Sequence, residues 1–456
     1  MADCVVILAI VFALASSTLS ATCPYDDVNC QCVNTSVTCG SLNSVPPLKT
    51  GTDVIAVDTL EFDGGEITDI PADSLPPHLV SISISDNPLN LVSGDAFRKS
   101  AGTLDTLSIS DAAFTRLPDA LLRFTNLTNL TLMFTDIDDW NIPVLQRLAP
   151  ALRSLFLQDV GLTAWPTWVS YFTKLRTLDI DVDDIESMPD DAFSSMKDTL
   201  TEFSFNGGNL THLPKALSAL TNLTILDLGG NALLNVNGRP GIEQLASFNC
   251  AKTLLTLTIP NTGLYIVPNL SSFTNVTNLD LSLNMISKID PQNFPPNLLS
   301  LDLNENDINE ITDASFKNCS HLQTLNLAYN PLTTISWSAF TTHQWLLSLD
   351  LTRTSLTQMP IALLPLTKLT TLGMAGIFTL ICPCPPSPEW ITWYGSVKGR
   401  ITFYGICSQQ GSIESYVNGS CQTTTPCSPG NIGARVHSAS YTYLCLILSF
   451  LIYVCQ

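Results

Sequence analysis

Basic residues are scarce in this sequence. Twenty Lys and Arg stand against forty Asp and Glu, which gives a formal net charge of −20. A protein that binds nucleic acid needs a basic face for the phosphates, so we expect no nucleic-acid partner. The acidic excess has two interpretations, namely solubility or a preference for partners with a basic surface.

The sequence also lacks the residue patterns of an enzyme. No nucleophile motif, metal-ligand cluster or phosphate-binding loop is present. Neighbouring carboxylates on the expected strands have no evident cause for a shifted pKa. The five His residues are scattered, and we expect them to be solvated loop residues: His78, His212, His321, His343 and His437. We therefore predict a protein that is not an enzyme and needs no cofactor or metal.

Apolar runs long enough to cross a membrane are missing as well. The run from Val5 to Leu14 is shorter than the roughly 20 residues of a spanning helix. Small residues follow it, as in a secretory signal, although Asp3 stands where a basic residue is usual. We predict a signal peptide over residues 1–20, with an uncleaved anchor as the less favoured alternative.

The C-terminal apolar run, Tyr441 to Val454, is also short. A stalk and spacer over residues 422–440 precede the hydrophobic tail over 441–456, which matches a glycolipid (GPI) attachment signal. We predict attachment at Asn431, with Ser428 as second choice. This places the protein on the extracellular face of the plasma membrane. A single-pass tail anchor and a secreted protein are the alternatives.

Sequons for N-glycosylation support the secretory route. The nine N-x-S/T positions are Asn34, Asn126, Asn129, Asn209, Asn222, Asn269, Asn275, Asn318 and Asn418.

One repeating pattern fills the middle of the chain. The stretch from Leu223 to Leu233 reads L-x-x-L-x-L-x-x-N-x-L, the leucine-rich repeat signature. Leu226 and Leu228 alternate with Asp227, which is the period of a strand. Fourteen copies occur, with first positions at Val57, Leu79, Leu104, Leu127, Leu152, Leu175, Leu200, Leu223, Leu254, Val276, Leu298, Leu322, Leu346 and Leu369.

A single repeat cannot bury its own leucines, so the repeats must stack. The sequence predicts an α/β solenoid over residues 54–378, a curved horseshoe with about 14 parallel strands. The ninth position of each repeat should turn inward and satisfy backbone groups of the loop. Asn87, Asn231, Asn284, Asn306 and Asn330 suit this role. Thr135, Asp183, Thr262 and Thr354 are weaker substitutes, and Gly65, Ala112, Val160, Gly208 and Ile377 cannot fill it.

The cysteines fall at the two ends of the repeats. Cys23, Cys30, Cys32 and Cys39 precede the first repeat, and Cys382, Cys384, Cys407 and Cys421 follow the last. The open ends of a solenoid need caps, and a secreted protein can staple them with disulfides. A zinc site is the less favoured alternative. We expect Cys250 and Cys319 to be buried thiols, while Cys427 is left over.

These ends resemble the caps of extracellular leucine-rich repeat proteins. Cys23-Pro24, Cys30-Gln-Cys32, Val37 and Cys39 look like the N-terminal cap, over residues 21–53. Cys382-Pro-Cys384, Trp390, Cys407 and Cys421 look like the C-terminal cap, over 379–421. The resemblance implies the pairs Cys23–Cys32, Cys30–Cys39, Cys382–Cys407 and Cys384–Cys421. The family's Asn-Pro-Trp entry to the second cap is absent.

The whole pattern is most similar to GPI-anchored leucine-rich repeat receptors of the Nogo-receptor and lamprey variable-lymphocyte-receptor kind. The resemblance implies recognition of an extracellular protein through the concave face, as receptor, co-receptor or adhesion molecule. Signalling would then need a transmembrane co-receptor. Two alternatives remain open, namely a structural surface or matrix protein that self-associates and a secreted innate-immune recognition protein.

The concave face of such repeats is formed by the third, fifth, seventh and eighth positions. These positions carry one basic residue, Arg353, and thirteen acids: Glu61, Asp63, Asp86, Asp111, Asp159, Asp179, Asp181, Glu202, Asp227, Asp280, Asp302, Glu305 and Asp350. We expect a ligand with a basic surface. The candidate ligand-binding residues are Asp179, Asp181, Asp227, Asp280, Asp302, Phe134 and Phe156.

Phe134 and Phe156 belong to adjacent repeats, so we expect them about 5 Å apart, as an apolar anchor. The aspartates have a plainer interpretation as solvated strand residues. Calcium binding between them would lack a loop signature. A glycan on Asn129 would obstruct the N-terminal part of the face.

Overall fold

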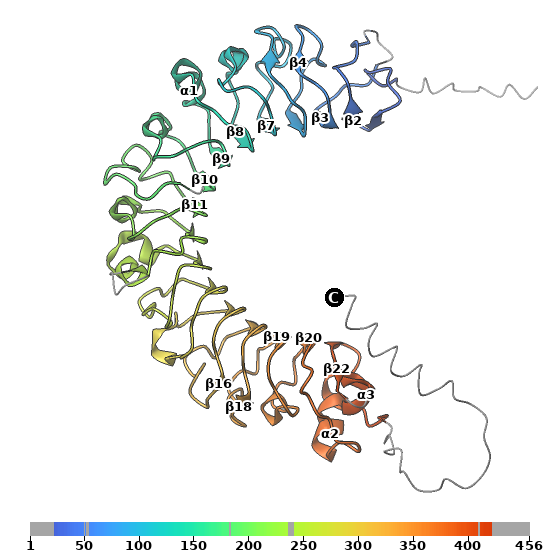
Figure 1. The fold of residues 1–456 in the computed structure, drawn as a ribbon, viewed down its shortest axis with the longest axis vertical. Coiled ribbons are helices and arrows are strands. Elements are labelled where there is room, and N and C mark those ends of the chain that lie inside the picture. The colour runs from blue at the N-terminus through green and yellow to red at the C-terminus, as the bar shows by residue number, and fades with distance from the viewer. Residues whose placement is uncertain are drawn as a thin grey trace, which may run out of the picture.

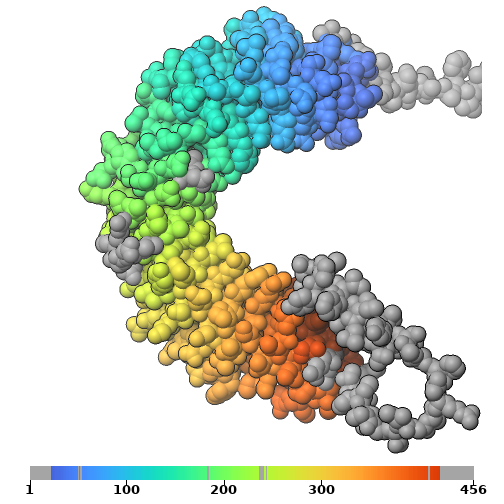
Figure 2. Space-filling model, viewed as in Figure 1, coloured from blue at the N-terminus to red at the C-terminus, as the bar shows by residue number. Residues whose placement is uncertain are grey.

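The computed structural model describes residues 22–49, 51, 54–181, 184–235, 241–408 and 411–421. Figure 1 shows a curved solenoid whose strands line the inner side of the arc, and Figure 2 shows the concave side open. The predicted signal peptide, spacer, tail, attachment site at Asn431, Asp183, Cys427 and His437 lie outside the described residues. None of the described helices is long and apolar enough to cross a membrane.

One sheet of seventeen strands runs through the solenoid. Neighbouring strands follow chain order and pair in parallel, except β1 and β2, which are antiparallel. The fourteen repeat strands are β3 (Thr59–Gly65), β5 (Ser81–Ser85), β7 (Thr106–Ser110), β8 (Asn129–Met133), β9 (Ser154–Gln158), β10 (Thr177–Asp181), β11 (Glu202–Asn206), β12 (Ile225–Asp227), β13 (Thr256–Thr258), β14 (Asn278–Asp280), β15 (Ser300–Asp302), β17 (Thr324–Asn326), β19 (Ser348–Asp350) and β20 (Thr371–Gly373). The predicted strand count is confirmed.

The caps extend this sheet at both ends. The N-terminal segment adds β1 (Cys30–Val33) and β2 (Ser36–Leu42), and the C-terminal segment adds β21 (Thr402–Tyr404). The open ends of the repeat stack are therefore covered by strands as well as by disulfides. The structure forms Cys23–Cys32, Cys30–Cys39, Cys382–Cys407 and Cys384–Cys421, the pairs that the resemblance implies.

The return segments carry short elements on the outer side of the arc (Figure 1). The short strands are β4 (Asp69–Ile70), β6 (Leu91–Val92), β16 (Glu310–Ile311) and β18 (Thr334–Ile335), with β22 (Ile406–Cys407) and β23 (Gly411–Ser412) in the C-terminal cap. The α-helices are α1 (Ile142–Leu148), α2 (Pro388–Val397) and α3 (Ile413–Val417). The 3-10 helices are η1 (Asp119–Arg123), η2 (Thr167–Tyr171), η3 (Lys215–Ala219), η5 (Ile242–Ser247), η6 (Asn249–Lys252), η7 (Pro291–Asn293) and η8 (Ile361–Leu363).

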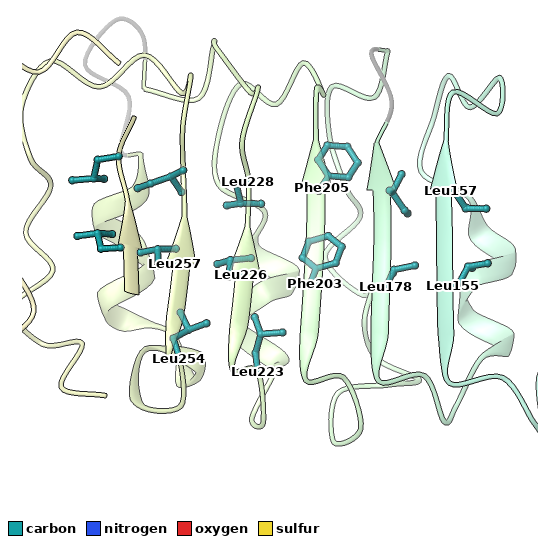
Figure 3. Packing of buried hydrophobic residues seen from close by; sticks show 14 of the residues in the cluster. Leu155, Leu157, Leu178, Phe203, Phe205, Leu223, Leu226, Leu228, Leu254 and Leu257 are labelled. Atoms are coloured by element: carbon teal, nitrogen blue, oxygen red, sulfur yellow. The ribbon is translucent and has the colours of Figure 1, made fainter. Parts of the chain in front are cut away.

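The first, fourth and sixth positions of the repeats form one continuous core. Leu223, Leu226 and Leu228 are each 0% exposed and stack against the same positions of the adjacent strands (Figure 3). Burying each such side chain contributes roughly 1.5–3 kcal/mol. Cys250 and Cys319 are buried in the same core without a disulfide, as predicted.

The seventh repeat shows why its ninth position is glycine. Its core residues are Phe203 and Phe205, which are larger than leucine. A Cβ atom on Gly208 would lie 2.3 Å from the Phe205 ring. The larger ring thus occupies space beside the turn where other repeats place asparagine.

The ninth-position asparagines turn inward and satisfy backbone groups, as predicted, and they also bridge successive repeats. Asn306 is 5% exposed, and its Nδ2 donates to the carbonyl oxygens of Leu281, Leu303 and Asn304 at 3.0–3.2 Å. Its Oδ1 accepts the N–H of Ile286, in the preceding repeat, at 2.9 Å. One side chain therefore satisfies buried backbone groups on both sides of the contact between repeats.

Removing this bridge should be costly. We expect Asn306→Ala to lower the free energy of unfolding by about 2–4 kcal/mol, because several buried polar groups lose their partner. Asn304→Ala, two residues away and half-exposed, is the matched control and should change stability by less than about 0.5 kcal/mol. Chemical denaturation of the two variants measures the difference, and equal losses would contradict the bridging role.

Candidate functional site

The fifth positions of the repeats form one row across the concave face. Strand register places Asp179 opposite Phe156 and Ser204, and Asp280 opposite Asp302. We call this set the fifth-position row: Glu61, Ser83, Ser108, Thr131, Phe156, Asp179, Ser204, Asp227, Thr258, Asp280, Asp302, Asn326, Asp350 and Gly373. Four of the five candidate aspartates belong to it, and Asp181 lies two residues further along β10.

Aspartates in this row also shape the backbone. The Oδ1 of Asp227 accepts the N–H of Gly229 at 2.9 Å, two residues later. Three other aspartates accept the backbone N–H two residues later in the same way, each at 2.8 Å: Asp280 from Ser282, Asp302 from Asn304 and Asp350 from Thr352. Each of these strands ends at the aspartate. The side chain therefore caps the strand in an Asx-type turn, a role that the sequence analysis missed.

Asp179 and Asp181 differ from these capping aspartates. Strand β10 continues past Asp179 as far as Asp181. The Asp179 side chain takes a hydrogen bond from Ser204 on the next strand, and Asp181 accepts one from Gln158 Nε2 at 3.1 Å. Both carboxylates are thus held by side chains of neighbouring strands.

Burial raises the pKa of three aspartates in the row, Asp179, Asp227 and Asp302. Desolvation raises the pKa of Asp227 above its usual value, and the charges of Asp179 and Asp280 raise it further. The pKa of Asp302 is raised in the same way, by burial first and then by Asp280 and Asp350. The expectation that these carboxylates have no cause for a shifted pKa is therefore wrong. Stacked repeats bring the charges together and remove part of their water.

The predicted aromatic pair is not formed. The register places Thr131 opposite Phe156, so Phe134 lies three residues further along the chain. Phe134 has a positive φ of 47° and is 48% exposed, while Phe156 is half-buried within the row. Among the described residues the two rings make no contact. The expected spacing is wrong because the two residues occupy different positions of their repeats.

Two further expectations concern single residues. His343 is 1% exposed and its Nε2 lies 3.1 Å from the carbonyl oxygen of Phe316, so it is a buried residue and not a solvated one. Burial lowers its pKa. Asn129 is half-buried, and its Nδ2, the atom that would carry a glycan, donates to Asp105, Thr106 and Thr128. The other eight sequons are exposed, and their use stays a prediction.

The raised pKa of Asp227 has a consequence for stability. The folded protein binds protons more tightly than the unfolded chain between the ordinary Asp pKa of about 4 and the raised value. This contribution to stability is fully present below the ordinary pKa and is lost as the pH rises through the folded pKa. Ionised Asp227 therefore destabilises the fold at neutral pH.

We expect Asp227→Asn to raise the free energy of unfolding at pH 7 by about 0.5 kcal/mol at low salt. An amide oxygen can still accept the N–H of Gly229, as Asn326 accepts that of Ala328 in its own repeat. The gain should vanish below about pH 4, because the Asp227 carboxyl is then protonated in both the folded and the unfolded protein. Urea denaturation at the two pH values checks this, with exposed Asp138→Asn as control. Loss of stability at pH 7 would contradict it.

Comparison with known proteins agrees with the repeat pattern. The family model described as "Leucine rich repeat" matches residues 173–233, 274–332 and 320–376. A segment of 159 residues is 31% identical to leucine-rich repeat-containing G-protein coupled receptor 5 of Rattus norvegicus. That segment covers 34% of this chain and 17% of the receptor.

Two solved structures share the fold at low sequence identity. A leucine-rich repeat protein of Leptospira interrogans is 19% identical, with a TM-score of 0.56, over 76% of this chain and 89% of its own. Toll of Drosophila, in its complex with Spatzle, is 17% identical, with a TM-score of 0.55, over 74% of this chain and 50% of its own. The repeats, the parallel sheet and these matches make the chain a leucine-rich repeat solenoid with disulfide pairs near both ends.

Proposed function

We propose that this protein is a receptor-like binder outside the cell that takes a protein ligand with a basic surface on its concave face. The observation that carries the proposal is the fifth-position row, whose carboxylates are fixed by hydrogen bonds along one open surface. The comparisons support a binding role of this type, because one relative is named a receptor and the Toll structure is a complex with Spatzle.

Fixed carboxylates favour binding for two reasons. Their conformational entropy is already lost in the free protein, so less is lost on association. Their summed field also steers a basic partner toward the face and repels acidic ones. Burial first, and the neighbouring carboxylates after it, raise the pKa of Asp227 and Asp302, so keeping these side chains ionised costs stability. A basic ligand would offset that cost.

Binding of a lysine-rich peptide to the purified protein tests the charge of the face. We expect the quadruple variant Asp179→Asn, Asp227→Asn, Asp280→Asn and Asp302→Asn to lower the affinity at least about tenfold and to reduce its salt dependence. The asparagine oxygens can still accept the turn N–H groups at positions 227, 280 and 302 and the Ser204 hydroxyl at position 179, so the fold should persist.

The matched control neutralises four exposed acids away from the concave positions: Asp138, Glu186, Asp191 and Glu310. It changes the net charge equally and should keep nearly all the affinity. Equal losses in both variants would show attraction to net charge and would sink the proposal. Self-association of the protein that neither variant alters would favour the structural alternative.

The glycolipid anchor is a separate proposal, which rests on the sequence of residues 422–456. Phosphatidylinositol-specific phospholipase C should release the protein from expressing cells into the medium, because it cleaves the lipid of such anchors. A known glycolipid-anchored protein on the same cells serves as positive control. Retention of this protein while the control is released would favour a tail-anchored span.

A further inference from the structure

The eighth position of the repeats lies at the edge of the concave face and is left-handed throughout the described repeats. Glycine, aspartate and asparagine accept this conformation readily, and they occupy most of these positions. Large side chains do not, yet five occur: Phe134, Leu283, Glu305, Tyr329 and Arg353, with φ of 47–55°. The last four stand in consecutive repeats.

These four residues lie side by side. The backbone N–H groups of these residues each donate to the next repeat, at 2.9 Å for Leu283, 3.0 Å for Glu305, 2.8 Å for Tyr329 and 2.7 Å for Arg353. Leu283 is 49% and Tyr329 48% exposed, so core packing does not explain their size. Strained, exposed and bulky residues in a row indicate a surface kept for contact with something else.

Arg353 is the cation of this group, and its side chain is held on two sides. Its guanidinium carbon lies 5.5 Å from the centre of the Tyr329 ring. On the other side, a Cβ atom on Gly376 would lie 2.8 Å from Arg353 Cγ, so only glycine leaves the room that the side chain uses. An aromatic face and a bare backbone thus orient the guanidinium.

The donors of Arg353 are open. Within the described residues its side chain makes no ion pair or hydrogen bond, although the chain carries twice as many acids as bases. The nearby Asp350 does not serve it, because its Oδ1 accepts the N–H of Thr352 and packs over Gly373. An oriented guanidinium with free N–H groups is suited to bind a carboxylate with two parallel hydrogen bonds.

We propose that Tyr329 and Arg353 form a binding position for a carboxylate of the ligand. The inference rests on the proposed function, since the same ligand would lay its basic surface along the fifth-position row. Asp350 belongs to the same repeat as Arg353. Two strand spacings, or roughly 10 Å, separate Asp350 from Asp302. The ligand would therefore carry an acidic group about 10 Å beyond its basic residues, and this would set its direction on the face.

Two peptides test the inference on the purified protein. One joins a lysine block to a glutamate block through a short Gly-Ser linker, and the other has glutamine in place of glutamate. The glutamine peptide has the higher positive charge, so attraction to an acidic face alone favours it. We expect the opposite order, with the glutamate peptide bound roughly tenfold more tightly, from charge-assisted hydrogen bonds to Arg353.

Arg353→Gln should abolish this preference and should not lower the affinity for the glutamine peptide, since it removes a positive charge from the acidic face. Tyr329→Leu, which keeps an apolar side chain but removes the ring, should reduce the preference. Lys368→Gln is the matched control: Lys368 lies 3.3 Å above the Trp345 ring, but outside the concave positions. It should leave the preference intact. Equal thermal unfolding of the variants would confirm that they are folded.

The outcomes separate the two proposals. A preference for the glutamine peptide in the wild-type protein, or a glutamate preference that survives Arg353→Gln, overturns the carboxylate position and leaves the basic-ligand function standing. Binding of neither peptide overturns the function, and the inference falls with it.

Discussion

The stacking of one repeat on the next depends on satisfying buried backbone groups at the turn that follows each strand. The leucines can leave water only if the loop behind them has no orphaned N–H or C=O group. Asn284, Asn306 and Asn330 meet this requirement by bonding to their own repeat and to the preceding one. Core burial and polar satisfaction therefore form a single constraint, repeated along the arc.

Where asparagine is absent, the neighbouring repeats compensate. Ala112 has no side chain to offer, and its N–H donates to Thr135 of the next repeat at 3.1 Å. Gly208 makes room for Phe205, and Asn231 accepts the N–H of Leu210 in that repeat. The solenoid tolerates these departures because each of these turns lies against the turn of the next repeat, which supplies the missing partner.

The same geometry joins structure and function on the concave face. Asp227, Asp280, Asp302 and Asp350 end their strands by holding a backbone N–H, and the second oxygen of Asp302 also accepts a hydrogen bond from Asn326 on the next strand at 3.0 Å. The stability that these charges cost at neutral pH is divided among the separate repeats of Asp179, Asp227 and Asp302. At the edge, the left-handed eighth position displays whatever side chain it carries. Along the chain, the eighth-position residues change from aspartates such as Asp86 and Asp111 to the mixed set Leu283, Glu305, Tyr329 and Arg353.

The sequence by itself determined the repeats, their strands, the inward asparagines and the residue types of each face. The reason is that leucines spaced in this pattern are buried when the repeats stack on one another. Tertiary structure decided which of those residues meet. Register separated Phe134 from Phe156, stacking shifted the pKa of Asp227, and burial enclosed His343. Asp227-x-Gly229 carried a local signal for its turn, whereas the contact of Tyr329, Arg353 and Gly376 carried none. Repeat periodicity fixes position within a unit, but side-chain contacts between units depend on register and twist, which residue spacing does not encode.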